Sequence, residues 1–134
     1  MYIRSDIAEA VIEAAEAKAA DIGIAVTVVV LDGAGNLKAL SRMEGAWLGS
    51  IDVAMKKAKT SALFEMETQN VGEISKPGAQ AHGIELTNDG LVTFADGIPL
   101  KTVGGELLGA IGVSGGQVAQ DYDVACAGLA AIGA

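Results

Sequence analysis

One apolar stretch, IAVTVVVL at residues 24–31, constrains the fold of this chain more than any other feature. It is rich in β-branched residues, which favour strands, and it is apolar on both faces. A strand with two apolar faces lies inside a sheet that is covered on both sides. The turn DGAGN (32–36) leads from it into a second predicted strand, LKALSRM (37–43). A connection this short joins antiparallel neighbours.

Predicted helices precede and follow this hairpin. Apolar positions recur at helical spacing from Ser5 to Gly23. The same spacing returns from Ser50, a candidate N-cap, to about Met66. A third amphipathic pattern covers VAQDYDVACAGLAAI (118–132). These three segments supply the helices that cover the sheet.

The remaining strands are predicted in the second half of the chain. LVTFA (91–95), GIPLKT (97–102) and ELLGAIGV (106–113) are short apolar runs separated by DG and GG turns. Residues 68–90 follow neither the helical nor the strand period, so they predict a long, partly irregular excursion. The order of elements predicts an α/β (α+β) chain in three layers, with an antiparallel sheet between helices. The strand–helix alternation of a Rossmann fold is missing.

Length, charge and cysteine content exclude several classes of protein. A chain of 134 residues is expected to form a single domain, residues 1–134. Its net charge of −8 disfavours nucleic acids and anionic membrane surfaces as partners. The longest apolar run is strand-sized and the N-terminus begins a helix instead of a secretory signal, so a cytoplasmic location is expected. One cysteine and one histidine cannot build a Cys/His zinc cage, and no metal site is predicted.

The glycine-rich segment GAIGVSGG (109–116) raises the question of a phosphate-binding loop. It matches neither GxxxxGK[ST] nor GxGxxG, the two common nucleotide patterns. We therefore interpret Gly109 and Gly112 as strand positions that permit close approach of another backbone, and Gly115 and Gly116 as the turn into the last helix. A weaker alternative stays open, in which the amides of that turn hold a ligand carboxylate.

Four blocks of the chain, in order, resemble the GlcG/HbpS family, also called the haem-degrading domain family. They are VVVLDGAGNLKALSRMEGA, SIDVAMKKAKTSALF, HGIELTNDGLVTFADGIPL and LGAIGVSGG, and the resemblance extends from about Ile7 to Ile132. It implies a profilin-like α/β/α fold with an antiparallel sheet of about five strands. It also implies self-association into a homo-oligomer and, because some members bind haem, haem as the candidate cofactor.

The first predicted helix departs from the haem-binding members of this family. Those members use a histidine of the first helix as iron ligand, and SDIAEAVIEAAEAKAAD (5–21) contains none. The remaining candidates for the iron ligand are His82, Met43 and a residue from across an oligomer interface.

His82 and Glu85 form the first candidate ligand-binding pair. His82 is the only histidine, and it follows the Pro-Gly segment of the excursion. It is either an iron ligand or general base, oriented by Glu85 if the excursion folds back, or a solvated loop residue.

Arg42 and Lys57 form the second candidate pair, matched to recurrent basic positions of the family-like blocks. Two converging cations in an acidic protein can hold a carboxylate or a haem propionate. Alternatively, each pairs with a local acid such as Glu44 or Asp52. The neighbouring cations of the same cluster, Lys56 and Lys59, are expected to be solvated.

Several other residues receive structural interpretations. Cys126 is expected to be a small hydrophobic residue of the last helix, and Asp121 to stabilise the start of that helix. Asp96 precedes a glycine and is interpreted as a turn residue. Trp47 is expected to be an exposed apolar contact, either at an oligomer interface or stacked on a flat ligand.

No nucleophile–base or paired-carboxylate arrangement stands out, so no catalytic residue is assigned. The leading hypothesis is a small-molecule-binding protein of the GlcG/HbpS type, with a haem-binding accessory role as its specific form. Its ligand would lie between the excursion, the second helix and a neighbouring subunit. The alternatives are an enzyme acting on a small organic acid, ketone or quinone-like metabolite, and a structural homo-oligomer without ligand.

Overall fold

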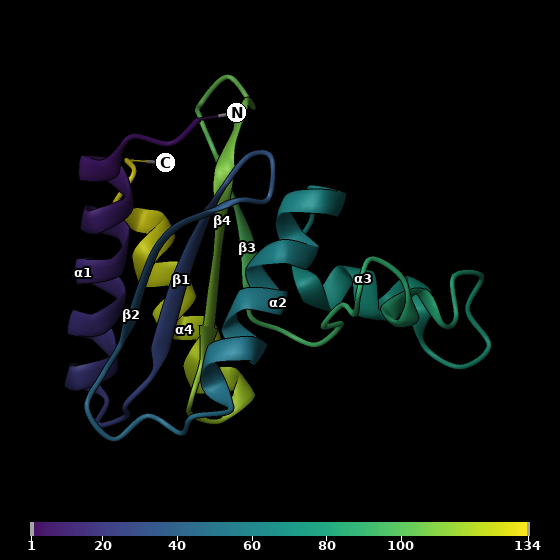
Figure 1. Ribbon diagram of the computed structural model, residues 1–134, viewed down its shortest axis with the longest axis horizontal. Coiled ribbons are helices and arrows are strands. Elements are labelled where there is room, and N and C mark those ends of the chain that lie inside the picture. The colour runs from purple at the N-terminus through teal and green to yellow at the C-terminus, as the bar shows by residue number, and fades with distance from the viewer. Residues whose placement is uncertain (1, 134) are drawn as a thin grey trace.

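The computed structural model describes residues 2–133 and arranges them as helices on both faces of a sheet (Figure 1). The elements, in chain order, are α1 (Ser5–Asp21), β1 (Thr27–Asp32), β2 (Leu37–Arg42), α2 (Ser50–Phe64), α3 (Thr68–Ser75), the 3₁₀ helix η1 (Ile84–Leu86), β3 (Gly97–Lys101), β4 (Leu107–Ser114) and α4 (Val118–Ala130). No helix in the described part of the chain is long and apolar enough to cross a lipid bilayer.

The sheet is antiparallel, with strand order β2-β1-β4-β3. The predicted hairpin is confirmed, because β1 pairs with β2 through the turn after Asp32. That carboxylate accepts hydrogen bonds from the amides of Ala34 and Asn36, both at 2.9 Å. β1 also pairs with β4 on its other side and is buried over its first five residues. The central, covered strand predicted from its two apolar faces is therefore present.

Helices cover the two faces of the sheet unequally. α1 and α4 lie side by side on one face, and α2 lies on the other (Figure 1). The first face carries the larger apolar cluster, with Val11, Val28 and Ile111 fully buried. The second face uses alanines, such as Ala54 and Ala58, so α2 approaches the strands closely. The predicted three-layer arrangement is confirmed.

The sheet contains four strands in the described residues, one fewer than expected. The prediction of a strand at LVTFA (91–95) was wrong, because its backbone finds partners outside the sheet. The amide of Leu91 donates to the carbonyl of Glu85, and the amide of Val92 donates to the Thr60 hydroxyl of α2 at 3.2 Å. The segment therefore crosses over α2 and α3 before the chain enters β3.

Two glycines of β4 permit close backbone approach, as the sequence predicted. A β-carbon at Gly112 would lie 2.1 Å from the carbonyl oxygen of Ala54 in α2. One at Gly109 would lie 2.1 Å from the carbonyl oxygen of Leu31 in β1. Both distances are far below van der Waals contact, so Gly112 permits the close approach of α2 to the sheet and Gly109 the close approach of β1 to β4.

The excursion, residues 68–90, is more ordered than its sequence suggests. It contains α3 and η1, and it projects away from the three layers (Figure 1). α3 has only eight residues, but it buries Thr68, Val71 and Ser75. α2 ends two residues earlier than expected, at Phe64, where Glu65 takes a left-handed conformation with φ 54°.

Candidate functional site

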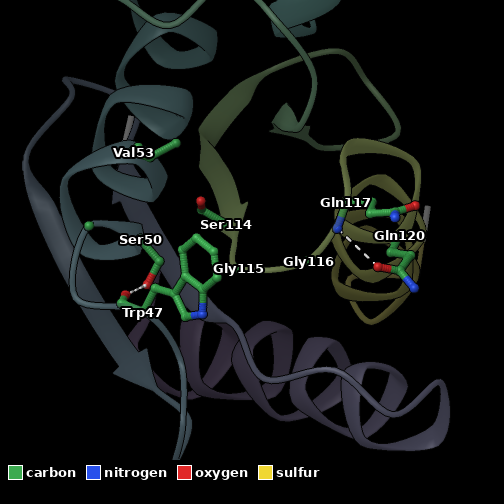
Figure 2. A pocket seen from close by; sticks show the side chains of 9 residues that line it. Trp47, Ser50, Val53, Ser114, Gly115, Gly116, Gln117 and Gln120 are labelled. Carbon is green, nitrogen blue, oxygen red and sulfur yellow. Dashed lines mark hydrogen bonds between the residues drawn. The ribbon is translucent and has the colours of Figure 1, made fainter.

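A cavity of about 560 Å³ lies between the start of α2 and the start of α4 (Figure 2). We call it the Trp47 cavity. Its lining residues are Trp47, Gly49, Ser50, Val53, Ser114, Gly115, Gly116, Gln117 and Gln120. Figure 2 shows Trp47 on the α2 side and Gln117 and Gln120 on the α4 side. The cavity thus joins one aromatic wall to one amide-bearing wall.

A buried hydroxyl pair positions the α2 side of the Trp47 cavity. The Ser50 hydroxyl donates to the carbonyl oxygen of Trp47 and accepts from the Thr27 hydroxyl of β1 at 2.7 Å. The prediction that Ser50 caps α2 was wrong, since Ser50 is the first helical residue and its hydroxyl ties the preceding loop to the sheet. The Trp47 side chain remains 81% exposed above this anchor.

The α4 side is built on the glycine turn, whose amides are already occupied. The carboxylate of Asp121 accepts from the amides of Gly115 at 3.3 Å and Gly116 at 2.8 Å. The amide of Gln117 donates to Oε1 of Gln120 at 2.9 Å. The predicted turn is confirmed. The Asp121 carboxylate accepts hydrogen bonds from the amides that the alternative interpretation assigned to a ligand carboxylate.

Gly115 itself cannot carry a side chain without a shift of the backbone. Its φ is 149°, and a β-carbon there would lie 2.4 Å from the carbonyl oxygen of Ala25. The turn therefore passes tightly over the start of β1, which holds Ser114 and Gly116 at the cavity wall.

Lys57 lies in the core of the protein behind this turn. Its side chain is 1% exposed, and its ammonium group donates to the carbonyl oxygen of Val113 at 2.7 Å and to Asp96 Oδ2 at 3.4 Å. Asp121 Oδ2 lies 3.8 Å from the same Nζ atom. Lys57 therefore pairs with acids, as one interpretation held, but the acids come from distant parts of the chain and not from Asp52.

Burial dominates the titration of this charged cluster. It lowers the pKa of Lys57 against the opposing effect of both carboxylates. It raises the pKa of Asp96 to about 7, with Lys57 acting in the opposite direction. The pKa of Asp121 is also raised by burial, although the Gly116 and Gly115 amides and Lys57 oppose the rise. Asp96 is fully buried, so its interpretation as a plain turn residue missed its main contact.

The four predicted ligand-binding residues do not come together. Arg42 is exposed at the end of β2, one edge of the sheet. His82 is exposed on the excursion, near the opposite edge, with Nδ1 3.3 Å from the carbonyl oxygen of Ser75. Glu85 lines a separate cavity beside α3, and Lys57 is internal.

That second cavity, of about 500 Å³, is called the α3 cavity here. Gln69, Glu73 and Lys76 contribute to it from α3 and the residue that follows, Glu85 from η1, Phe94 from the crossing segment and Val118 from α4. It shares the first turn of α4 with the Trp47 cavity, because Gln117 and Gln120 line one and Val118 lines the other.

The sequence of the chain is similar to those of known proteins. Residues 3–130 match the family described as haem degrading protein HbpS-like. The chain belongs to the HbpS-like family. The resemblance predicted from four sequence blocks is thereby confirmed.

Two sequence relatives are similar to most of this chain. An uncharacterised 15.0 kDa protein of the dhaT-dhaS intergenic region of Citrobacter freundii is 38% identical over 110 residues, which are 81% of this chain and 77% of that protein. The corrinoid adenosyltransferase PduO of Salmonella typhimurium is 37% identical over 120 residues, which are 89% of this chain. The match covers only 35% of PduO, so the chain spans about a third of that relative.

Solved structures share the HbpS-like fold closely. A crystal structure described as a PduOC:Heme complex superimposes with a TM-score of 0.91 at 32% identity, covering 98% of this chain and 95% of that one. The superposition therefore covers nearly all of this chain.

Sequence reasoning missed most of the Trp47 cavity. Trp47 was named as a candidate for stacking, and Gly115 and Gly116 as a turn, but nothing in the sequence joined them. The pairing of Thr27 with Ser114 across β1 and β4, and the Ser50–Thr27 hydroxyl contact, bring the two segments together.

Proposed function

We propose that the protein binds a small, flat molecule with a polar or anionic edge in the Trp47 cavity, and that haem or a related tetrapyrrole is this molecule. The observation that carries the proposal is the exposed indole of Trp47 on the wall of a cavity between two helix N-termini (Figure 2). Ligand cavities combine an apolar surface with a few placed polar groups, and this cavity has that character.

The aromatic wall supports a flat ligand. Trp47 is 81% exposed and the next residue, Leu48, is 72% exposed. Large apolar side chains exposed side by side mark a binding surface. An indole ring stacks on a planar conjugated ligand in an offset arrangement and loses its own contact with water there.

The polar wall supports an anionic edge on that ligand. α2 begins at Ser50, so the positive end of its dipole lies at the cavity, whereas the turn before α4 is already capped by the Asp121 carboxylate. The lining residues carry no formal charge, and the Asp121 carboxylate behind the turn lies 3.8 Å from the Lys57 ammonium group. The hydroxyl of Ser114 and the side-chain amides of Gln117 and Gln120 supply hydrogen-bond donors.

Haem fits this cavity through its ring and carboxylates, and not through its iron. The ring matches the indole wall, and the propionates match the Ser114 hydroxyl and the side-chain amides of Gln117 and Gln120. The lining residues include no histidine, cysteine, methionine or tyrosine, the side chains that ligate haem iron. The relative described as a PduOC:Heme complex makes a tetrapyrrole the first ligand to test.

The cavity supports binding better than catalysis. General acid–base chemistry on an organic acid or ketone needs a titratable side chain within reach of the substrate. Serines, glutamines and glycines form the polar wall, and Lys57 is turned into the core.

A titration with haemin and with metal-free protoporphyrin IX tests the proposal. Trp47 is the only tryptophan, so quenching of its fluorescence reports binding at the cavity. We expect both porphyrins to bind saturably with similar affinity. The Trp47 variants lack this tryptophan, so their binding is followed by the absorbance of the porphyrin; Trp47→Ala should weaken binding about tenfold, the equivalent of one lost aromatic contact, while Trp47→Phe keeps most of it.

His82→Ala is the matched control, because His82 lies on the excursion and should leave binding unchanged. If protoporphyrin IX fails to bind and His82→Ala abolishes the haemin Soret shift, the ligand is held through iron elsewhere and the Trp47 cavity is not the site. Absence of saturable binding by either porphyrin would reject the tetrapyrrole.

The exposed apolar residues of the excursion favour a second role, self-association. Leu86 is 85% exposed and Ile74 is 41% exposed, on a segment that projects from the three layers (Figure 1). A projecting segment with exposed large hydrophobic residues is unfavourable in water unless another surface covers it. A second copy of this chain is the proposed cover. Light scattering should show an oligomer that Leu86→Glu dissociates and Thr87→Glu leaves intact.

A further inference from the structure

A series of contacts connects the buried charges of the protein to one wall of the Trp47 cavity. The Asp121 carboxylate accepts hydrogen bonds from the amides of Gly115 and Gly116, and both glycines line that cavity. Asp121 Oδ2 lies 3.8 Å from Lys57 Nζ, and Asp96 Oδ2 lies 3.4 Å from the same nitrogen. Two side chains therefore connect Asp96 to the glycine turn at the cavity.

Asp96 is the acid of this cluster with the fewest hydrogen-bond donors. Its Oδ1 atom is buried and has no partner in the described part of the chain, and its Oδ2 atom accepts from Lys57. Lys57 also donates to the carbonyl oxygen of Val113 at 2.7 Å. A buried, ionised carboxylate with an unpaired oxygen is costly, and a bound proton removes that charge. Burial accordingly raises the pKa of Asp96 to about 7, although Lys57 acts in the opposite direction.

The elements packed around Asp96 differ in the charge that they bring to it. The titratable groups that face it are Lys57 from α2 and Asp121, Asp123 and Cys126 from α4. α3 contributes the neutral hydroxyl of Thr68, which accepts from the amide of Gly97 at 2.9 Å. β4 contains no titratable side chain. Lys57 is therefore the cation that opposes the acids of this cluster.

We propose that protonation of Asp96 regulates the Trp47 cavity, which binds an anionic edge more tightly when Asp96 is neutral than when it is ionised. With Asp96 neutral, the charges of Lys57 and Asp121 balance each other. With Asp96 ionised, two carboxylates face one ammonium group, so one negative charge remains behind the glycine turn. That charge repels an anion at the cavity wall, whose lining residues carry no charge. Affinity for an anion therefore falls as pH rises, and a bound anion in turn favours protonated Asp96.

This regulation concerns the site of the proposed function and rests on that proposal for its ligand. The charge at the cavity wall can nevertheless be measured without a porphyrin. Trp47 is the only tryptophan, and its side chain is 81% exposed. Iodide is an anionic quencher of indole fluorescence, so a negative charge near the ring lowers its local concentration. Acrylamide is a neutral quencher and does not respond to that charge.

Quenching of Trp47 by iodide and by acrylamide, measured across neutral pH at constant ionic strength, tests the proposal. We expect the iodide quenching constant to fall by about a third as pH rises, and the acrylamide constant to stay unchanged. The midpoint of the fall should equal that of the Asp96 carboxyl resonance in carbon-13 NMR. Asp96→Asn keeps the shape of the side chain without its charge, and it should remove the fall.

Glu13→Gln is the matched control, because it removes one negative charge at an exposed position of α1 and should keep the fall. Other titrating groups, His82 among them, are common to all three proteins. An equal fall in wild type and Asp96→Asn would overturn the proposal. So would an iodide constant that does not change with pH in the wild type. The comparison of midpoints needs only the wild type, and a midpoint different from that of Asp96 would also overturn it.

Binding of protoporphyrin IX provides the second measurement. Over the same pH range, the wild type should lose about fivefold in affinity relative to Asp96→Asn. The ratio of the two affinities cancels the titration of the porphyrin itself. A ratio that stays constant with pH would overturn the regulation while leaving the porphyrin site intact. If no porphyrin binds to either protein, the proposed function fails, and iodide quenching still decides whether Asp96 controls the charge at the cavity.

Discussion

Lys57 and Asp96 form an ion pair inside the protein, with Nζ and Oδ2 3.4 Å apart and side chains 1% and 0% exposed. Asp121 completes the cluster from α4. This buried charged cluster therefore joins α2, the residue that precedes β3, and α4. The first predictions concern this cluster.

Removing the Lys57 charge should strongly destabilise the protein. Lys57→Met leaves Asp96 and Asp121 buried without their cation, and loss of one partner of a buried pair costs about 3–5 kcal/mol. Urea denaturation measures the change in free energy of unfolding. Lys56→Met is the control, because Lys56 pairs with the mostly exposed Asp52 at 3.1 Å and should change stability by about 1 kcal/mol or less. Equal effects of the two substitutions would contradict a buried cluster.

Asp96 should make the free energy of unfolding fall as pH rises from about 4 to about 7. Its pKa is raised from 3.8 to about 7 in the folded protein, so the folded state binds more protons than the unfolded state between these values. The contribution of Asp96 to the free energy of unfolding is therefore present at low pH, falls between about pH 4 and 7, and levels off above.

The difference between wild type and Asp96→Asn isolates this effect, because the other titrating groups are common to both proteins. From pH 5 to pH 8 the wild type should lose stability relative to Asp96→Asn in urea denaturation. A difference that stays constant with pH would mean that Asp96 keeps an ordinary pKa.

Gly112→Ala should force α2 away from the sheet. The new β-carbon would lie 2.1 Å from the carbonyl oxygen of Ala54 and 2.7 Å from the amide nitrogen of Ala58. Overpacking of this kind costs about 3 kcal/mol or more, since both contacts are with helix backbone that cannot move alone. Thermal denaturation of Gly104→Ala provides the comparison, because a β-carbon there has no neighbour closer than 3.7 Å. Similar melting temperatures for the two variants would disprove close packing at Gly112.

Asp121→Ala should loosen the glycine turn of the Trp47 cavity. The substitution frees the amides of Gly115 and Gly116 and removes one acid from Lys57. Amide hydrogen exchange at these two glycines should accelerate at least tenfold, since their side-chain acceptor is gone. Asp123→Ala, at an exposed neighbour on the same helix, should leave their exchange unchanged. Slow exchange in Asp121→Ala would show that the turn is held by other contacts.

The fold could be predicted where local pattern and tertiary environment agree. The run 24–31 is apolar on both faces and became the central β1, and the glycines of β4 became points of close approach. LVTFA has an equally strand-like composition, but Thr60 and Glu85 take two of its amide hydrogen bonds. Composition cannot reveal a partner that only the tertiary fold supplies.

The site was harder to predict than the fold, because its contacts join residues that are far apart in the sequence. Lys57 was compared with the nearby Asp52, whereas its partners Asp96 and Asp121 follow much later in the chain. His82 drew attention as the only histidine, yet the structure leaves it exposed on the excursion. A residue type that occurs once in a chain is an obvious candidate for a functional role. The tertiary fold decides which candidate side chains lie close together.

The first turn of α4 has a further consequence, because it is a wall common to two cavities. Gln117 and Gln120 face one cavity and Val118 faces the other. A guest that displaces this turn when it enters one cavity reshapes the other. By thermodynamic reciprocity, whatever change in affinity the first guest imposes on the second is returned by the same factor. One short stretch of helix thus links the shapes of the two cavities.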